Sequence, residues 1–165
     1  MIDERKASLQ GFADVRNLAD VPGFENVTLT RTSGQHGSDA TMAAAGAVLG
    51  EVCGVVFSAE GEKTLYLAGD TVWNSSVEEV LASARPEIVI LNAGDAQIPG
   101  LDPIIMGKED VKRVHDAAPF ATVIASHLES VNHAVLTRAE LNAFVTEHDL
   151  GDRVLVPADG ETYSF

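Results

Sequence analysis

Three short apolar runs in the second half of the chain limit the possible fold more than any other feature. The runs are EIVILN (87–92), ATVIAS (121–126) and RVLVPA (153–158), and each is rich in β-branched residues with no polar alternation. Continuous apolar runs of this length are typical of strands that are buried on both faces of a sheet. Amphipathic segments separate them, so the sequence predicts an α/β fold in which helices pack on a sheet.

Capping patterns predict where the helices begin. Ser75 and Ser76 each precede a glutamate by three residues, which predicts a capping box at the start of the first helix. Thr137 and Glu140 predict a second capping box, and Gly151 suits the position just past the end of that helix. The predicted helices are VEEVLASA (77–84), KEDVKRVHDAA (108–118, ending before Pro119) and RAELNAFVTEH (138–148).

The first half of the chain predicts more strand and one ambiguous segment. VTLTRT (27–32) alternates with a period of two and predicts a half-buried strand. GVVFSA (54–59) and KTLYLAG (63–69) flank the turn EGE and predict a hairpin. In GSDATMAAAGAVLG (37–50) the alanines favour helix and the glycines favour loop, and we expect a loop with a short helical turn.

Composition excludes several classes of function. The net charge of −14 repels phosphate backbones and anionic lipid, and no basic patch is present, so we expect neither nucleic acid nor membrane as a partner. No apolar stretch approaches the roughly 18 residues of a membrane span, and the charged N-terminus lacks the apolar core of a secretory signal. Cys53 is the only cysteine, which excludes an internal disulfide framework. We therefore expect one cytoplasmic domain, residues 1–165, that acts on a small-molecule substrate.

Polar residues follow most of the predicted strands. His36, Asp70, Asn92, His127 and Asp159 all stand at or just after a strand end. Side chains at such positions converge on one crevice in sheet-based α/β proteins, and histidine with aspartate there suits zinc, iron or manganese.

Each of these residues also has an ordinary interpretation. Asp95 and Asp159 suit turns, and His127 suits a hydrogen-bonded histidine at the edge of the core. A loop could bring His133 beside the same crevice, and Trp73 could line that pocket or cover the sheet.

An ordered set of motifs resembles the metallo-β-lactamase superfamily, and more narrowly its bacterial metal-dependent hydrolases. The set extends from about Gly11 to Phe165. It consists of Gly34-Gln35-His36-Gly37, Gly69-Asp70-Thr71 followed by Val72-Trp73, LNAG (91–94), HLESVNH (127–133) and the closing PADGETYSF.

The resemblance implies an αββα sandwich that holds two metals, usually zinc, at one edge. It implies that His36 is a ligand of the first metal, that Asp70 bridges both metals and that His127 is a ligand of the second. A hydroxide activated by the metals would then attack the substrate, which makes Asp70 and His127 the catalytic residues. The residues expected to support these ligands or to contact substrate are Asn92, Glu129, Asn132, His133 and Trp73.

One part of the superfamily pattern is absent. The sequence contains no His-x-His-x-Asp-His run, so the resemblance implies the C-terminal part of the sandwich, truncated at its N-terminus, with four expected ligands missing. His36, Asp70 and His127 could in principle hold a single zinc with an open position. One apolar sheet face would lack its cover, and we expect a homodimer, a higher assembly or a partner chain to bury it.

Three functions are compatible with this sequence. The first is a metal-dependent hydrolase whose substrate is unassigned. The second is a non-catalytic fragment or remnant of that fold, and the third is a module that binds a small ligand or a metal without activity of its own. Metal content distinguishes these functions best.

Overall fold

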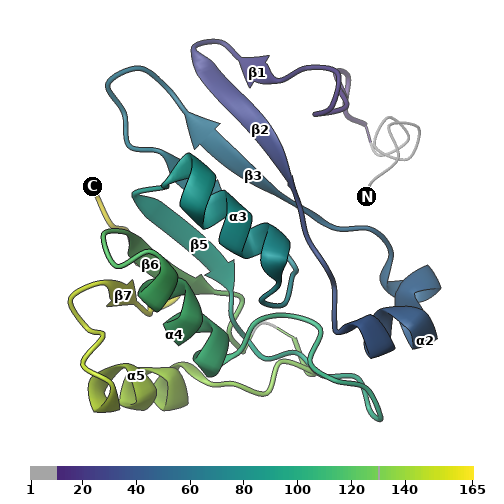
Figure 1. The fold of residues 1–165 in the computed structure, drawn as a ribbon, viewed down its shortest axis with the longest axis vertical. Helices are drawn as coiled ribbons and strands as arrows, with labels where there is room; N and C mark the ends of the chain where they lie inside the picture. The colour runs from purple at the N-terminus through teal and green to yellow at the C-terminus, as the bar shows by residue number, and fades with distance from the viewer. Residues whose placement is uncertain (1–10, 130) are drawn as a thin grey trace.

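A computed structural model describes residues 11–129 and 131–165 of the chain. Its seven strands form one mixed sheet whose order, β1 to β7, follows the sequence (Figure 1). Neighbouring strands are antiparallel from β1 to β4 and parallel from β4 to β7. The strands are β1 (Gly23–Phe24), β2 (Val27–Ser33), β3 (Cys53–Ser58), β4 (Leu65–Leu67), β5 (Ile88–Asn92), β6 (Thr122–Ser126) and β7 (Val154–Leu155). The helices are α2 (Asp39–Leu49), α3 (Ser75–Ala84), α4 (Lys108–Ala117) and α5 (Arg138–Glu147).

The main hydrophobic core lies between one face of the sheet and helices α3, α4 and α5. Figure 1 shows α3 and α4 crossing in front of the sheet, with α2 set to one side. Tyr66, Val89 and Val123 point from the strands into this core and are fully buried. Their helical counterparts include Val77 on α3 and Val111 on α4, also fully buried. The α/β class predicted from the sequence is confirmed.

The opposite face of the sheet is only half-buried. The strand register aligns Val55 with Leu67, Leu67 with Ile90, Ile90 with Ile124 and Ile124 with Leu155. These five side chains therefore form one apolar row across β3 to β7, and each is partly exposed. Within the described residues the prediction that these strands are buried on both faces is wrong, because α3, α4 and α5 pack on one face and the row on the other face is partly exposed.

Two of the predicted helices match the structure closely. Helix α4 begins at Lys108 as predicted, and α5 begins after the capping box of Thr137 and Glu140. The left-handed residue after α5 is Asp149 (φ 55°), not Gly151, because the chain turns as soon as the helix ends.

Helix α3 begins differently from the prediction. Its N-cap is Asn74, whose side-chain oxygen accepts hydrogen bonds from the backbone N–H groups of Ser76 and Val77. Asparagine is among the best N-cap residues, so Asn74 caps this helix and the predicted capping boxes of Ser75 and Ser76 do not form.

Helix α2 corrects the loop predicted for residues 37–50. Ser38 caps it by accepting a hydrogen bond from the N–H of Thr41, and the alanines that follow have the highest helix propensity. Gly46 is tolerated inside the helix, and Gly50, with a φ of 73°, is its C-cap. One strand is also shorter than predicted: β7 stops at Leu155, and Pro157 just beyond it has no N–H to extend the ladder.

No helix in the described part of the chain is long and apolar enough to cross a membrane.

Candidate functional site

Three neighbouring parallel strands bring three of the predicted site residues together. Asp70 follows β4, Asn92 ends β5 and His127 directly follows β6. The Nδ2 of Asn92 donates a hydrogen bond of 2.6 Å to the Oδ1 of Asp70, and the Nε2 of His127 lies 4.0 Å from the same oxygen. The side chains of Asp70 and His127 are 38% and 28% exposed, so solutes can reach this cluster.

The backbone of His127 is held in an unusual conformation against Gly94. His127 has a φ of 58°, in the left-handed region that residues other than glycine seldom adopt. A Cβ at Gly94 would lie 2.3 Å from the carbonyl oxygen of His127, so only glycine fits there without movement. The glycine of the LNAG run therefore sets how closely β5 and the His127 segment approach each other.

The Asp70–His127 pair is compatible with metal ligation. Ligand atoms at about 2.0–2.2 Å from a tetrahedral zinc lie about 3.3–3.6 Å apart, so the two side chains, now 4.0 Å apart, would have to approach each other by about 0.5 Å to bind one ion. The Nδ1 of His127 is buried with no hydrogen-bond partner among the described residues, so hydrogen bonding within the protein does not explain why this ring is placed here. A carboxylate and an imidazole are both common zinc ligands.

His36 lies apart from this pair. Its Nδ1 is 3.5 Å from the carbonyl oxygen of Leu49, and the residue is among those that line a cavity of about 580 Å³ with Arg31 and Glu51. Within residues 11–129 and 131–165, no three His, Cys, Asp or Glu side chains are close enough together to hold a metal. The role of His36 as a ligand stays a prediction.

The backbone beside His36 is nevertheless tied to the segment that follows Asp70. The N–H of Gln35 donates to the Oγ1 of Thr71, and the N–H of Val72 donates to the carbonyl of Gln35, each at 2.9 Å. These bonds hold the segments after β2 and β4 side by side at the same edge of the sheet.

The other predicted substrate-contacting residues have different surroundings. Glu129 forms an ion pair with Arg138. His133 and Asn132 are both exposed, and the Nδ1 of His133 lies 3.4 Å from the Oδ1 of Asn132. Trp73 packs against the main core and lines a separate cavity of about 550 Å³. Their predicted roles toward a substrate stay predictions.

Two carboxyl groups near this edge have raised pKa values. Burial raises the pKa of Asp95, and the charge of Asp110 adds to this effect, while a hydrogen bond from Gln97 opposes it. Burial also raises the pKa of Asp110, against a hydrogen bond from the Gly107 backbone and the nearby charge of Arg113. Asp95 has a left-handed backbone conformation, with a φ of 49°.

Sequence reasoning missed Arg138, which contacts both Glu129 and Asp159. A signal was present, because arginine as the first residue of a helix faces the positive end of the helix dipole and needs acidic neighbours.

Comparison with known proteins identifies the fold. The UPF0173 protein YddR of Bacillus subtilis is 42% identical over 163 residues, which are 99% of this chain and 63% of that protein. The crystal structure of isothiocyanate hydrolase from Delia radicum gut bacteria has a TM-score of 0.91 and 49% identity, over 99% of this chain and 65% of that one. A possible metal-dependent hydrolase from Veillonella parvula has a TM-score of 0.93 and 40% identity, over 96% and 62%. A metallo-β-lactamase fold protein of B. subtilis, YhfI, matches 86% of the chain and 50% of its own length at a TM-score of 0.59 and 12% identity.

This chain forms part of a metallo-β-lactamase fold. The resemblance and the sheet-and-helix architecture expected from the sequence are thereby confirmed at the level of the fold. No family model matches the chain. The chain spans less than two thirds of the length of each of these relatives.

Proposed function

We propose that this chain contributes to the active site of a metal-dependent hydrolase, with Asp70 and His127 as metal ligands. The observation that carries the proposal is the approach of these two side chains to 4.0 Å at the ends of β4 and β6. The names of two relatives support the reaction class: an isothiocyanate hydrolase with 49% identity and a possible metal-dependent hydrolase with 40% identity.

Asn92 orients the carboxylate in this proposal. Its amide donates to one oxygen of Asp70 and limits rotation of the carboxylate, so that the charge stays directed toward His127. A bound zinc, or manganese or iron in its place, would lower the pKa of water and so supply a nucleophile at neutral pH.

Further ligands must come from outside this pair. His36 is one candidate, since its backbone neighbour Gln35 is tied to the segment after Asp70. We propose that the others come from a second copy of the chain, or from polypeptide equivalent to the part of the relatives that this chain does not span. Asp70, His127 and these further ligands would then together hold the two metals that the resemblance implies.

We propose a small electrophilic substrate, with an isothiocyanate as the first compound to test. The support is the name of the relative with 49% identity, and the net charge of −14 disfavours large polyanionic substrates. The experiment measures loss of allyl isothiocyanate by its ultraviolet absorbance, with and without added zinc. Turnover that requires zinc and disappears in Asp70→Ala supports the proposal.

A matched carboxylate serves as the control. Asp152 is exposed and precedes β7, at the opposite edge of the sheet from the site, so Asp152→Ala should keep the turnover of the wild type. Equal loss of turnover in Asp70→Ala and Asp152→Ala would overturn the assignment of Asp70. Zinc binding that depends on Asp70, without hydrolysis of any isothiocyanate, ester or lactone, would instead favour a metal-binding module without activity of its own.

A further inference from the structure

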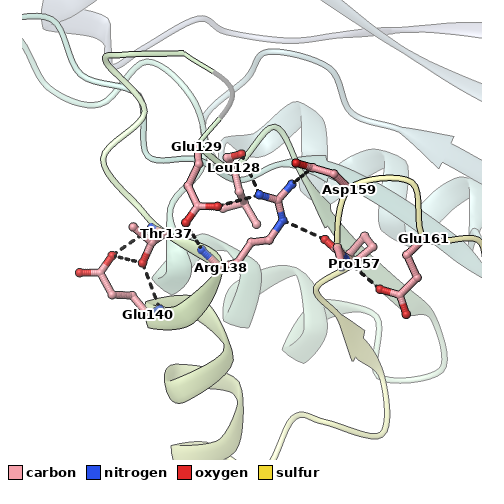
Figure 2. A network of polar contacts seen from close by, with 9 residues as sticks. Leu128, Glu129, Thr137, Arg138, Glu140, Pro157, Asp159 and Glu161 are labelled. Carbon is pink, nitrogen blue, oxygen red and sulfur yellow. Dashed lines mark hydrogen bonds and ion pairs between the residues drawn. The ribbon is translucent and has the colours of Figure 1, made fainter.

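Arg138 connects the segment after β6 to the segment after β7. Its Nη1 donates to the Glu129 carboxylate at 2.7 Å and to the carbonyl of Leu128 at 3.4 Å (Figure 2). Its Nε donates to the carbonyl of Pro157 at 2.9 Å, and its Nη2 pairs with Asp159. The backbone N–H of Arg138 donates to Glu129 as well, at 3.1 Å.

The segment that Arg138 holds is conformationally strained. His127 and Glu129 have φ values of 58° and 56°, and neither residue is glycine. Left-handed conformations at such residues persist only where the surroundings impose them. Leu128, between them, is buried in the main core and fixes the middle of the segment. The His127 carbonyl packs so closely against Gly94 that a Cβ would not fit there, and the Arg138 contacts hold Glu129 and the Leu128 carbonyl.

The guanidinium group suits this task better than an ammonium group would. Its planar nitrogens donate in three directions at once, to the segment after β6, to the Pro157 carbonyl and to Asp159. The side chain is 26% exposed, so water screens these contacts less than it screens a fully exposed ion pair.

We propose that Arg138 is a positioning residue that keeps the His127 ring facing Asp70 by fixing the strained segment from His127 to Glu129. The inference rests on the proposed function, in which His127 must face Asp70 to bind a metal. Arg138 acts through Glu129 and the backbone, and it forms no hydrogen bond or ion pair with Asp70 or Asn92.

The test compares Arg138→Gln, Arg138→Lys and the control Arg113→Gln. Arg113 also forms a helix ion pair, with Asp110 at 3.0 Å, but it lies on α4. Two quantities are measured: the nitrogen chemical shifts of the His127 ring in zinc-free protein, and zinc affinity by competition with a chromophoric chelator.

We expect Arg138→Gln to shift the His127 ring signals and to weaken zinc binding by about tenfold, the lower end for residues that support a metal ligand. Arg138→Lys should restore part of both, and Arg113→Gln should change neither. Unchanged ring signals and zinc affinity in Arg138→Gln would overturn the inference. If that variant does not fold, Asp159→Asn and Glu129→Gln each remove one partner of Arg138. The His127 ring shifts and the zinc affinity of these variants then test the inference in the same way.

The design separates this inference from the proposed function. Zinc binding that His127→Ala does not weaken would contradict the proposed function, whereas the ring signals would still decide whether Arg138 positions His127. Zinc binding that depends on His127 but not on Arg138, with unchanged ring signals, would leave the proposed function standing and refute the role of Arg138.

Discussion

Replacing Gly94 by alanine should displace the His127 segment by a distance that the structure sets. The new Cβ would lie 2.3 Å from the His127 carbonyl oxygen and 3.1 Å from the Cβ of Ala134. The carbonyl must therefore retreat by about 0.7 Å to reach the 3.0 Å below which real Cβ contacts essentially never fall. Gly94 does not have a left-handed φ, so the cost is steric and not conformational.

The expected cost follows from the size of this clash. Overpacking of a tight site costs about 1–3 kcal/mol, and the lower chain entropy of alanine offsets about 0.4–1 kcal/mol. We therefore expect Gly94→Ala to lower the free energy of unfolding by about 1–2 kcal/mol, measured by urea denaturation. Because His127 moves, zinc affinity should fall by about tenfold as well.

Gly151→Ala is the matched control for Gly94→Ala. A Cβ at Gly151 would meet nothing within 4 Å, so this substitution should leave stability unchanged or raise it by about 0.4–1 kcal/mol. If both variants unfold at the same urea concentration and bind zinc equally, the argument that Gly94 sets the position of His127 is refuted.

Three further predictions concern stability and assembly. Thr137→Ala removes the N-cap of α5 and should lower the free energy of unfolding by about 1 kcal/mol, measured by urea denaturation, whereas Thr137→Ser should change it little. Equal stability of the two variants would contradict the capping role of Thr137. Because burial raises the pKa of Asp95 above 3.8, the folded chain binds this proton more tightly, and stability falls as pH rises through the raised pKa. The Asp95→Asn variant should therefore have a higher melting temperature than the wild type at pH 7, and this difference should become smaller toward pH 4. A difference that does not change with pH would contradict the raised pKa of Asp95. The apolar row that includes Leu67, Ile90 and Ile124 should be buried between copies, so light scattering at micromolar concentration should give a dimer or larger, which Ile90→Lys dissociates; a monomeric wild type would contradict this.

Local sequence signals predicted those elements whose formation depends on nearby residues. Helix α5 followed from Thr137 and Glu140, and the core strands β5 and β6 followed from continuous apolar runs. Helix α2 was missed because Gly46 and the glycines at its ends suggested a loop, whereas the Ser38 cap and the alanines between them stabilise a helix.

The site was predictable to the extent that it depends on strand ends. Asp70, Asn92 and His127 converge because β4, β5 and β6 are parallel neighbours. The apolar runs indicated β5 and β6, whereas β4 was predicted only as one strand of a hairpin. The partners of Arg138 could not be predicted in this way. Its bonds to Glu129 and Asp159 join residues 9 and 21 positions away through the left-handed turns after β6, and no local pattern encodes that path.

The central claim is that Asp70 and His127 hold a metal, and zinc content tests it most directly. The chain is purified without chelators, and zinc per chain is measured by mass spectrometry for the wild type, Asp70→Ala, His127→Ala and Asp152→Ala. We predict at least one zinc per chain in the wild type and in Asp152→Ala, with a marked loss in the other two variants. Zinc content that is the same in all four proteins, or absent from the wild type even after zinc is added, would contradict the assignment.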